Sequence, residues 1–342
     1  MPAEWEPHLA SYIIWPHNPE TWPGRFAEIA PAFAQLAAAI SAFEPVRVVV
    51  QPGADLQAIR QMIAEAAPAG IPAKPERVEF AEIPSDDSWV RDTGPVFVNC
   101  ANAPGQLALA WRFNAWGGKY PDFADDAALA ARLAARWGVE AVRLDLVLEG
   151  GAIEVDGEGS LLATESCLLN PNRNPGLDRA ALESYLHSAL GARKVLWLAG
   201  GIRGDDTDGH VDEVARFIGP GRVAAAYTDD PRDPNYGVLA ENLARLCAMT
   251  DARGRQLAVV RLPMPHPAEG EGQPPPASYA NFYFVNGGVL MPAFGCPQDA
   301  QARALLEGAL PGRRVVEIAA TDLALGLGGI HCLTQQHPAP AA

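Results

Sequence analysis

The sequence lacks a basic surface of the kind that binds nucleic acid. Lys and Arg number 26 against 41 Asp and Glu, which gives a formal net charge of −15. The basic residues form no dense run that could neutralise a phosphate backbone, so we expect no nucleic-acid partner. The acidic balance is compatible with a small cationic substrate, although in many proteins it serves solubility alone.

Membrane and export signals are also missing. We find no apolar run that approaches the ~18 residues of a membrane span. The first eight residues, MPAEWEPH, have neither a basic start nor an apolar core like that of a signal peptide. The five cysteines are odd in number and lack CxxC spacing, which favours reduced thiols over disulfides or a common structural zinc site. We expect a cytoplasmic protein with no membrane partner.

A four-part pattern repeats along the chain. Two β-rich runs joined by a tight turn are followed by a helical stretch and one more strand, starting near residues 95, 152, 214 and 281. The predicted helices cover 127–137, 179–190, 236–249 and 298–310, and the closing strands 142–146, 194–198, 256–262 and 314–318. The N-terminal strand–helix–strand–helix–strand region supplies a fifth unit, with elements shared across the chain ends.

Five such units predict one closed α/β ring, because repeats of this length bury their faces against one another. With 49% hydrophobic and 20% charged residues, the chain has the composition of a soluble globular protein. We predict a single domain over residues 1–337 and a disordered tail over 338–342. Two domains stay open as an alternative, but the Pro-rich stretch 265–276 lies inside a unit and is predicted as a surface loop.

Chemically reactive residue types concentrate at the junctions between units. These candidates are Asp92, Glu149, His210, Asp212 and, in the glycine-rich stretch GLGGIHCLTQQ, Cys332. In a ring of equivalent units, equivalent loops point to a common centre, so we expect these side chains to surround one cavity. Each residue taken alone could instead have an ordinary structural role.

These structural roles are the ones that surface and core residues commonly have. Asp92 beside Arg91 is typical of a helix cap or an ion pair, and Glu149 of a solvated turn. His210 and Asp212 share one face of a segment that we predict to be extended, where a structural histidine is common. Cys332 alone would be a buried thiol in a turn. Only their shared position at unit junctions favours a site.

Several carboxylates, one histidine and one cysteine suit attack on a guanidinium carbon. Two carboxylates can hold the planar cation by paired hydrogen bonds. A thiolate can attack the central carbon, while a histidine protonates departing ammonia and later activates water. A non-catalytic protein that binds arginine-like ligands stays open, but it leaves a cysteine amid glycines unexplained.

A metal hydrolase is the other alternative. His210, Asp212, His331 and Cys332 could in principle bind zinc. The sequence has no HExxH or CxxC arrangement to support such a centre. His331 and Cys332 are adjacent, and on an extended segment they would point to opposite faces. We therefore expect no metal.

Longer motifs resemble agmatine deiminases of the guanidine-modifying pentein superfamily, which also contains bacterial-type peptidylarginine deiminases. The motifs are MPAEWEPH (1–8), DDSWVRDTGP (86–95), LEGGAIEVDGEGSLLATESCLLNPNRNP (148–175), GDDTDGHVDEVARF (204–217), SYANFYFVNGG (278–288) and GGIHCLTQQ (328–336). The resemblance implies a five-bladed α/β propeller with pseudo-fivefold symmetry. It also implies hydrolysis of agmatine to N-carbamoylputrescine and ammonia, in putrescine biosynthesis, without metal or organic cofactor.

The resemblance also implies a role for each candidate. Cys332 would be the nucleophile that forms an amidino-cysteine intermediate, and His210 the general acid and base. Asp92 and Asp212 would hold the guanidinium, and Glu149 would position both the guanidinium and the histidine.

Substrate recognition involves two further residues and two differences from the family motifs. Trp89 would form a wall of the pocket, and Asp206 would contact the substrate near its amine. Agmatine deiminases usually read GGGNIHC before the nucleophile, whereas Gly329 here directly precedes Ile330. Many also carry asparagines where this chain has Asp208 and Glu213, and these extra acids could favour a cationic tail. Peptidyl-arginine and free arginine remain alternative substrates, and a homo-oligomer stays open.

Overall fold

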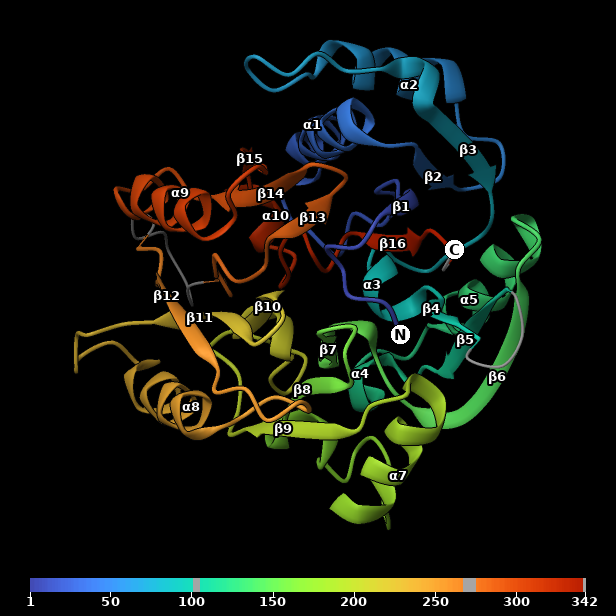
Figure 1. Ribbon diagram of the computed structural model, residues 1–342. Helices are drawn as coiled ribbons and strands as arrows, with labels where there is room; N and C mark the ends of the chain where they lie inside the picture. The colour runs from blue at the N-terminus through green and yellow to red at the C-terminus, as the bar shows by residue number, and fades with distance from the viewer. Residues whose placement is uncertain (101–104, 267–274, 341–342) are drawn as a thin grey trace.

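Five small sheets are arranged in a ring about a common centre (Figure 1). The computed structural model describes residues 1–100, 105–266 and 275–340. The predicted α/β ring of five units is confirmed. The chain is thus a five-bladed α/β propeller of ββαβ units.

Four blades follow one another along the chain. In each, the first two strands pair antiparallel and the third runs parallel to the second, with a helix between them. Blade by blade, the elements are β4 (Val96–Asn99), β5 (Gln106–Arg112), α5 (Ala124–Arg136) and β6 (Glu140–Val147); β7 (Glu154–Val155), β8 (Ser160–Thr164), α7 (Arg179–Leu190) and β9 (Lys194–Leu198); β10 (Ala215–Gly219), β11 (Arg222–Tyr227), α8 (Tyr236–Ala248) and β12 (Ala258–Pro263); β13 (Tyr283–Val285), β14 (Gly288–Ala293), α9 (Gln298–Ala309) and β15 (Arg314–Ala319).

The fifth blade joins the two ends of the chain, as predicted. β16 (Gln335–Pro338) pairs antiparallel with β1 (His8–Ile14), and β1, β2 (Val46–Val50) and β3 (Val78–Glu82) then run parallel. α1 (Phe26–Phe43) and α2 (Leu56–Glu65) connect these strands. Pro338 lies in β16 opposite His8, and the N–H of Ala339 donates to the Pro7 carbonyl at 2.7 Å. The prediction of disorder from residue 338 is therefore wrong at these two positions, and residues 341–342 lie outside the described part.

Helix α1 corrects the expectation that no apolar run approaches membrane-spanning length. Its 18 residues have a mean hydropathy of 1.5, enough for a span by length and composition. Half of this window is buried, and α1 packs against β2 and β15 through residues such as Ile29, Phe33 and Ile40. Its apolar character follows from its place in the core.

Local hydrogen bonds fix where the helices start. Asp55 accepts the N–H groups of Gln57 and Ala58 before α2, and Asp178 accepts that of Ala181 before α7. Such caps satisfy backbone donors that the first helical turn leaves unpaired. Apolar residues of the helices and sheets then pack between neighbouring blades. The Pro-rich loop predicted at 265–276 lies mostly outside the described residues.

Short helical turns occupy the blade junctions, where the sequence pattern predicted loops or extended chain. The turns next to the candidate residues are α3 (Val90–Thr93), η2 (Gly150–Ala152) and η3 (Val211–Glu213). The prediction that His210 to Asp212 is extended is wrong, because Asp212 lies within η3. The remaining short turns are η1 (Pro75–Arg77), α4 (Ala115–Gly118), α6 (Glu165–Leu168) and α10 (Thr321–Ala324).

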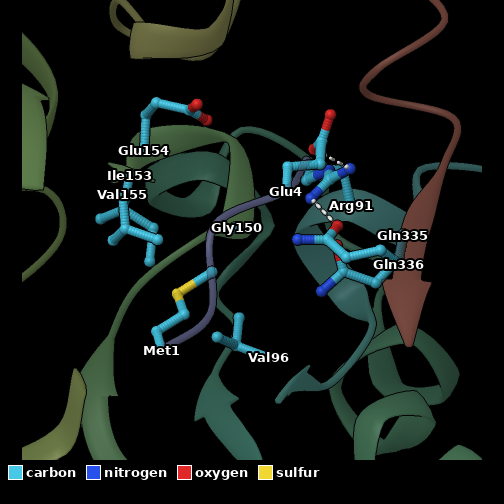
Figure 2. Close-up of a pocket in the computed structure, with 10 residues that line it drawn as sticks. All are labelled: Met1, Glu4, Arg91, Val96, Gly150, Ile153, Glu154, Val155, Gln335 and Gln336. Atoms are coloured by element: carbon cyan, nitrogen blue, oxygen red, sulfur yellow. Dashed lines mark hydrogen bonds and ion pairs between the residues drawn. The ribbon is translucent and has the colours of Figure 1, made fainter. Parts of the chain in front are cut away.

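The N-terminal segment runs beside a small cavity, which Met1 and Glu4 help to line (Figure 2). The cavity measures about 10 Å³, which is room for about one water molecule. Arg91 lies against it and donates to Glu4 at 3.1 Å and to Gln336 at 2.7 Å. These bonds tie the two chain ends to the junction that carries Asp92.

Candidate active site

The structure brings the five candidate side chains together from four blade junctions. His210 Nδ1 lies 3.7 Å from Asp92 Oδ1, and His210 Nε2 lies 3.8 Å from Glu149 Oε2. Cys332 Sγ lies 3.6 Å from Asp212 Oδ2. All five residues are buried, with Cys332 and Asp92 the most exposed at 7%.

Asp92 is held by two hydrogen bonds and does not cap a helix. Its Oδ1 accepts the N–H of Gly151 at 2.9 Å, and its Oδ2 accepts the indole N–H of Trp116 at 2.9 Å. A Cβ on Gly151 would lie 2.6 Å from His210 Nδ1 and 3.0 Å from Asp92 Oδ1. The absence of a side chain at Gly151 therefore lets the imidazole and the carboxylate approach the backbone closely.

A buried ion pair orients Glu149. Arg173 Nε donates to Glu149 Oε1 at 2.6 Å, and both side chains are fully buried. The same guanidinium donates to Asp208 Oδ2 at 2.6 Å and to the carbonyl of Thr207 at 2.9 Å. Arg173 thus fixes the carboxylate behind His210 and the loop that precedes it. Sequence reasoning did not select Arg173, although it lies within the NPNRNP motif.

The carboxylates hold His210 as a cation. Burial alone would lower the pKa of His210, but the charge of Asp92, with contacts to Cys167 and Glu149, raises it well above its usual value. Burial raises the pKa of Asp92, because it outweighs the stabilising charge of His210. The pKa of Glu149 is lowered despite burial, through His210 and Arg173. A protonated imidazole between two acids is the arrangement that a proton donor requires.

The Cys332 thiol lies between an amide and two acids. Asn281 Nδ2 lies 3.3 Å from Sγ, Asp212 Oδ2 at 3.6 Å and Glu213 Oε1 at 3.7 Å. Burial, followed by the charges of Asp212, Glu213 and Asp92, raises the pKa of Cys332 well above its usual value. Without a ligand, Cys332 is therefore a thiol at neutral pH, and a positive charge beside it would favour the thiolate.

His331 supports Asp212 from behind. Its Nδ1 lies 2.6 Å from Asp212 Oδ2, and its Nε2 lies 2.7 Å from Glu4 Oε2. His331 and Cys332 lie in a turn, so the prediction that they point to opposite faces of an extended segment is wrong; both contact Asp212. The pKa of Asp212 is lowered despite burial, chiefly through His331 and then His210 and Arg216.

Close packing surrounds Gly328 and Gly329, the latter at the position where the usual motif has Asn. A Cβ on Gly328 would lie 2.6 Å from Trp89 Cζ3, and one on Gly329 would lie 2.2 Å from Asn281 Oδ1. Trp89 is 6% exposed and also contacts Trp22, with ring centroids 5.7 Å apart. Trp89 and Asn281 therefore pack directly against the backbone of the nucleophile loop, residues 326–334.

The acids that the sequence suggested for the substrate tail have other contacts in the structure. Asp206 accepts the Tyr120 hydroxyl at 2.8 Å and lies 3.5 Å from Lys119 Nζ. Asp208 is bound to Arg173 and, at 3.1 Å, to Lys119, so it does not simply face solvent. Glu213 faces the thiol. The contacts therefore give no support to Asp208 or Glu213 as acids that select a cationic tail.

Among the described residues, one group of three could hold a metal ion by geometry. The ligand atoms of Glu149, Cys167 and His210 lie within 4.8 Å of one another. This set differs from the zinc ligands considered from the sequence. A metal ligand must be deprotonated, whereas the acids around His210 keep it protonated. The ion pair of Glu149 with Arg173 opposes a second cation further.

Comparisons with known proteins agree with this geometry. A family model described as Porphyromonas-type peptidyl-arginine deiminase matches residues 1–338. The chain is 41% identical over 364 residues to an agmatine deiminase of Ectopseudomonas mendocina (strain ymp), covering 99% of this chain and 95% of that one. It is similar to the solved structure of an agmatine deiminase of Enterococcus faecalis, with TM-score 0.91, 36% identity, and 100% and 96% of the chains covered. A Campylobacter jejuni agmatine deiminase with substrate bound gives TM-score 0.88 at 28% identity, covering 99% and 96%.

The fold and these relatives define the class: a pentein-fold hydrolase that acts on carbon–nitrogen bonds of amidines. Within that class, the chain belongs to the Porphyromonas-type peptidyl-arginine deiminase family.

Proposed function

We propose that this enzyme hydrolyses agmatine to N-carbamoylputrescine and ammonia through a covalent amidino-cysteine on Cys332. The observation that carries the proposal is the buried cluster in which His210 and Cys332 lie among Asp92, Asp212 and Glu149. Relatives named agmatine deiminase, at about 41% identity over nearly the whole chain, support the choice of substrate.

The carboxylates bind the guanidinium group of the substrate. The guanidinium is planar and delocalised, so its N–H groups pair with Asp92, which lies beside His210, and with Asp212, which lies beside Cys332. Glu149, held by Arg173, orients the histidine and contributes negative charge. A low-exposure site of this kind suits a small cation better than an arginine within a peptide.

The bound cation also activates the nucleophile. Burial and then three nearby carboxylates raise the pKa of Cys332 in the free enzyme, and the positive charge of the guanidinium opposes that shift. The thiol loses its proton to solvent, and the thiolate then attacks the guanidinium carbon and forms the C–S bond. His210 gives its proton to the departing nitrogen, and the C–N bond breaks to release ammonia.

The second half of the reaction reverses the role of His210. The neutral imidazole left by the first step takes a proton from water as the water oxygen attacks the amidino carbon. The C–S bond breaks with its electron pair going to sulfur, while the new hydroxyl group loses its proton to solvent; this releases N-carbamoylputrescine and restores the thiolate. Asp92 stabilises the imidazolium that forms again. No metal or organic cofactor takes part in these steps.

Product formation tests the proposal. Purified enzyme should release ammonia and N-carbamoylputrescine from agmatine faster than it releases ammonia from free arginine or a blocked arginine peptide. Cys332→Ser should abolish release, whereas Cys247→Ser, a matched change at an exposed free thiol, should leave it unchanged. Preference for arginine or the peptide would replace the substrate assignment with one of the alternatives. Binding of agmatine without product from any compound would leave a guanidinium-binding protein.

We also propose a cellular compartment and a pathway for this reaction. Reduced cysteines are suited to the cytoplasm, and all five cysteines, which lie in described segments, are free thiols. N-carbamoylputrescine is a precursor of putrescine, so we place the enzyme in cytoplasmic polyamine synthesis.

A further inference from the structure

Asn281 is a buried amide that the roles assigned so far leave unused. It lies just before β13, not within the strand as the sequence pattern predicts, and it is 1% exposed. Its main-chain N–H donates to the Ser278 carbonyl at 3.2 Å, and its own carbonyl accepts the N–H of His331 at 3.3 Å. Asn281 is therefore anchored to its own turn and to the nucleophile loop.

The orientation of the side-chain amide is fixed by a second bond to that loop. Oδ1 accepts the N–H of His331 at 2.8 Å, which leaves Nδ2 directed at Cys332 Sγ, 3.3 Å away. A flipped amide would place two donors face to face at His331, so the hydrogen-bond network selects this orientation. The N–H group that points at sulfur is thus set by the backbone next to the nucleophile.

The nucleophile loop is built closely around this amide. A Cβ on Gly329 would lie 2.2 Å from Asn281 Oδ1, so a side chain at 329 would displace the amide from Cys332. Among the side chains of the described residues that contact Sγ through a polar atom, Asn281 is the donor, whereas Asp212 and Glu213 present carboxylate oxygens. A donor favours the ionised form of sulfur, and a nearby carboxylate disfavours it.

We propose that Asn281 is a further catalytic residue that stabilises the Cys332 thiolate by donating an amide N–H to its sulfur. The contact serves twice: when the thiol loses its proton for attack, and when the C–S bond breaks and its electron pair returns to sulfur. The inference rests on the proposed role of Cys332 as nucleophile. The ionisation of the thiol is nevertheless measurable without any substrate.

The test is the pH dependence of Cys332 alkylation by iodoacetamide in the free enzyme, followed by mass spectrometry of the peptide that carries Cys332. Following that peptide separates Cys332 from the exposed Cys247 and half-buried Cys100. Asn281→Ala should slow alkylation about tenfold at pH values below the midpoint and move the midpoint up by about one pH unit. Asn281→Asp keeps the side-chain shape and replaces the donor with an acid, so it should shift the midpoint further upward. A change in access alone would alter the limiting rate at high pH and leave the midpoint in place.

A matched control is available in a different blade. Asn242 is 2% exposed and bonds the N–H of Ala199 and the carbonyl of Gly200, so Asn242→Ala removes a comparable buried amide without touching Cys332. Its alkylation midpoint should equal that of the unmodified enzyme. Folded Asn281→Ala or Asn281→Asp enzyme with an unshifted midpoint would overturn the inference, even if turnover falls. A shifted midpoint in an enzyme that does not deiminate agmatine would uphold the contact and reject the proposed function.

Discussion

His210 and Cys332 lie against different carboxylates, but the charge of Asp92 acts on both, and both pKa values are displaced upward. For His210, burial opposes the shift, and the charge of Asp92 is the main cause that raises its pKa. For Cys332, burial and the charges of Asp212, Glu213 and Asp92 all act together. In the free enzyme, His210 is therefore an imidazolium and Cys332 a neutral thiol. In the proposed mechanism, a guanidinium supplies the positive charge that the thiol lacks, which couples substrate binding to activation of Cys332.

Asp92→Asn should lower the pKa of His210. Removing the carboxylate removes the charge that stabilises the imidazolium 3.7 Å away, so deprotonation should occur about one pH unit or more lower. The measurement is an NMR titration of the His210 ring, assigned with a His210→Gln variant. The alkaline limb of kcat/KM for agmatine should move in the same direction. Asp122→Asn, at an exposed position, is the control. An unchanged His210 midpoint in Asp92→Asn would show that Asp92 does not set its charge.

Among the elements, the short junction turns matter more to the site than the long helices and strands. α3, η2 and η3 carry or flank Asp92, Glu149 and Asp212, and each is three or four residues long. The nucleophile loop then closes on them, with Gly328 against Trp89 and Gly329 against Asn281. The backbones of Gly328 and Gly329 pack against side chains from distant segments, so the nucleophile loop tolerates little added volume.

Gly329→Ala should abolish most of the activity while leaving the protein folded. Its Cβ would meet Asn281 Oδ1 at 2.2 Å, so the loop or the amide must shift and Cys332 loses its position. Misplacement of a reacting group by about 1 Å can cost roughly 100-fold in rate. The control is Gly308→Ala in α9, where a Cβ meets nothing within 4 Å; it should stabilise the fold by about 0.5–1 kcal/mol. The measurements are steady-state turnover and thermal unfolding, and full activity of Gly329→Ala would contradict this packing.

The long elements could be predicted from the sequence because burial imposes a period on them. Helix α7 and strand β9 occur where the apolar spacing places them. Turns of three or four residues have no period, so α3, η2 and η3 were missed. Helix α5 begins at Ala124, not at 127, because Asp86 Oδ2 from another segment accepts the N–H groups of Asp125 and Asp126 in its first turn. The candidate five could be selected by residue type and position, but their partners Arg173, Asn281 and Glu4 could not. Those contacts join distant segments, although each residue lies in a motif that resembles the family.

At the scale of the whole molecule, the chain ends close the ring and also reach its centre. Glu4 accepts from Arg216 at 2.7 Å, from the N–H of Phe284 at 3.0 Å and from Arg91 at 3.1 Å, and it lies 2.7 Å from His331. These partners come from β10, from β13, from α3 and from the nucleophile loop. One carboxylate near the N-terminus therefore joins separate blades and, through His331, supports Asp212.

Glu4→Gln should destabilise the fold by about 3–5 kcal/mol, because it leaves the buried Arg216 and Arg91 short of a counter-charge. Burial opposes ionisation of Glu4, but Arg216, His331 and Arg91 hold its pKa well below the usual value. Its contribution should thus be complete above about pH 4.3 and be lost as the pH falls below that value through the lowered pKa.

Denaturant unfolding of the Glu4→Gln variant and of the unmodified protein, at neutral and at acid pH, measures both effects. Glu28→Gln on the exposed side of α1 is the control and should stay within about 0.5 kcal/mol at every pH. Equal destabilisation by Glu4→Gln at neutral and strongly acid pH would contradict a role for the Glu4 charge.

The most direct test of the central claim is to trap the covalent intermediate. Enzyme mixed with agmatine and quenched in acid within a turnover should gain the mass of agmatine less ammonia, and peptide mapping should place that mass on Cys332. Cys332→Ser should gain none, and Cys247→Ser should gain it as the unmodified enzyme does. Formation of N-carbamoylputrescine by Cys332→Ser, or an adduct on another residue, would contradict Cys332 as the nucleophile.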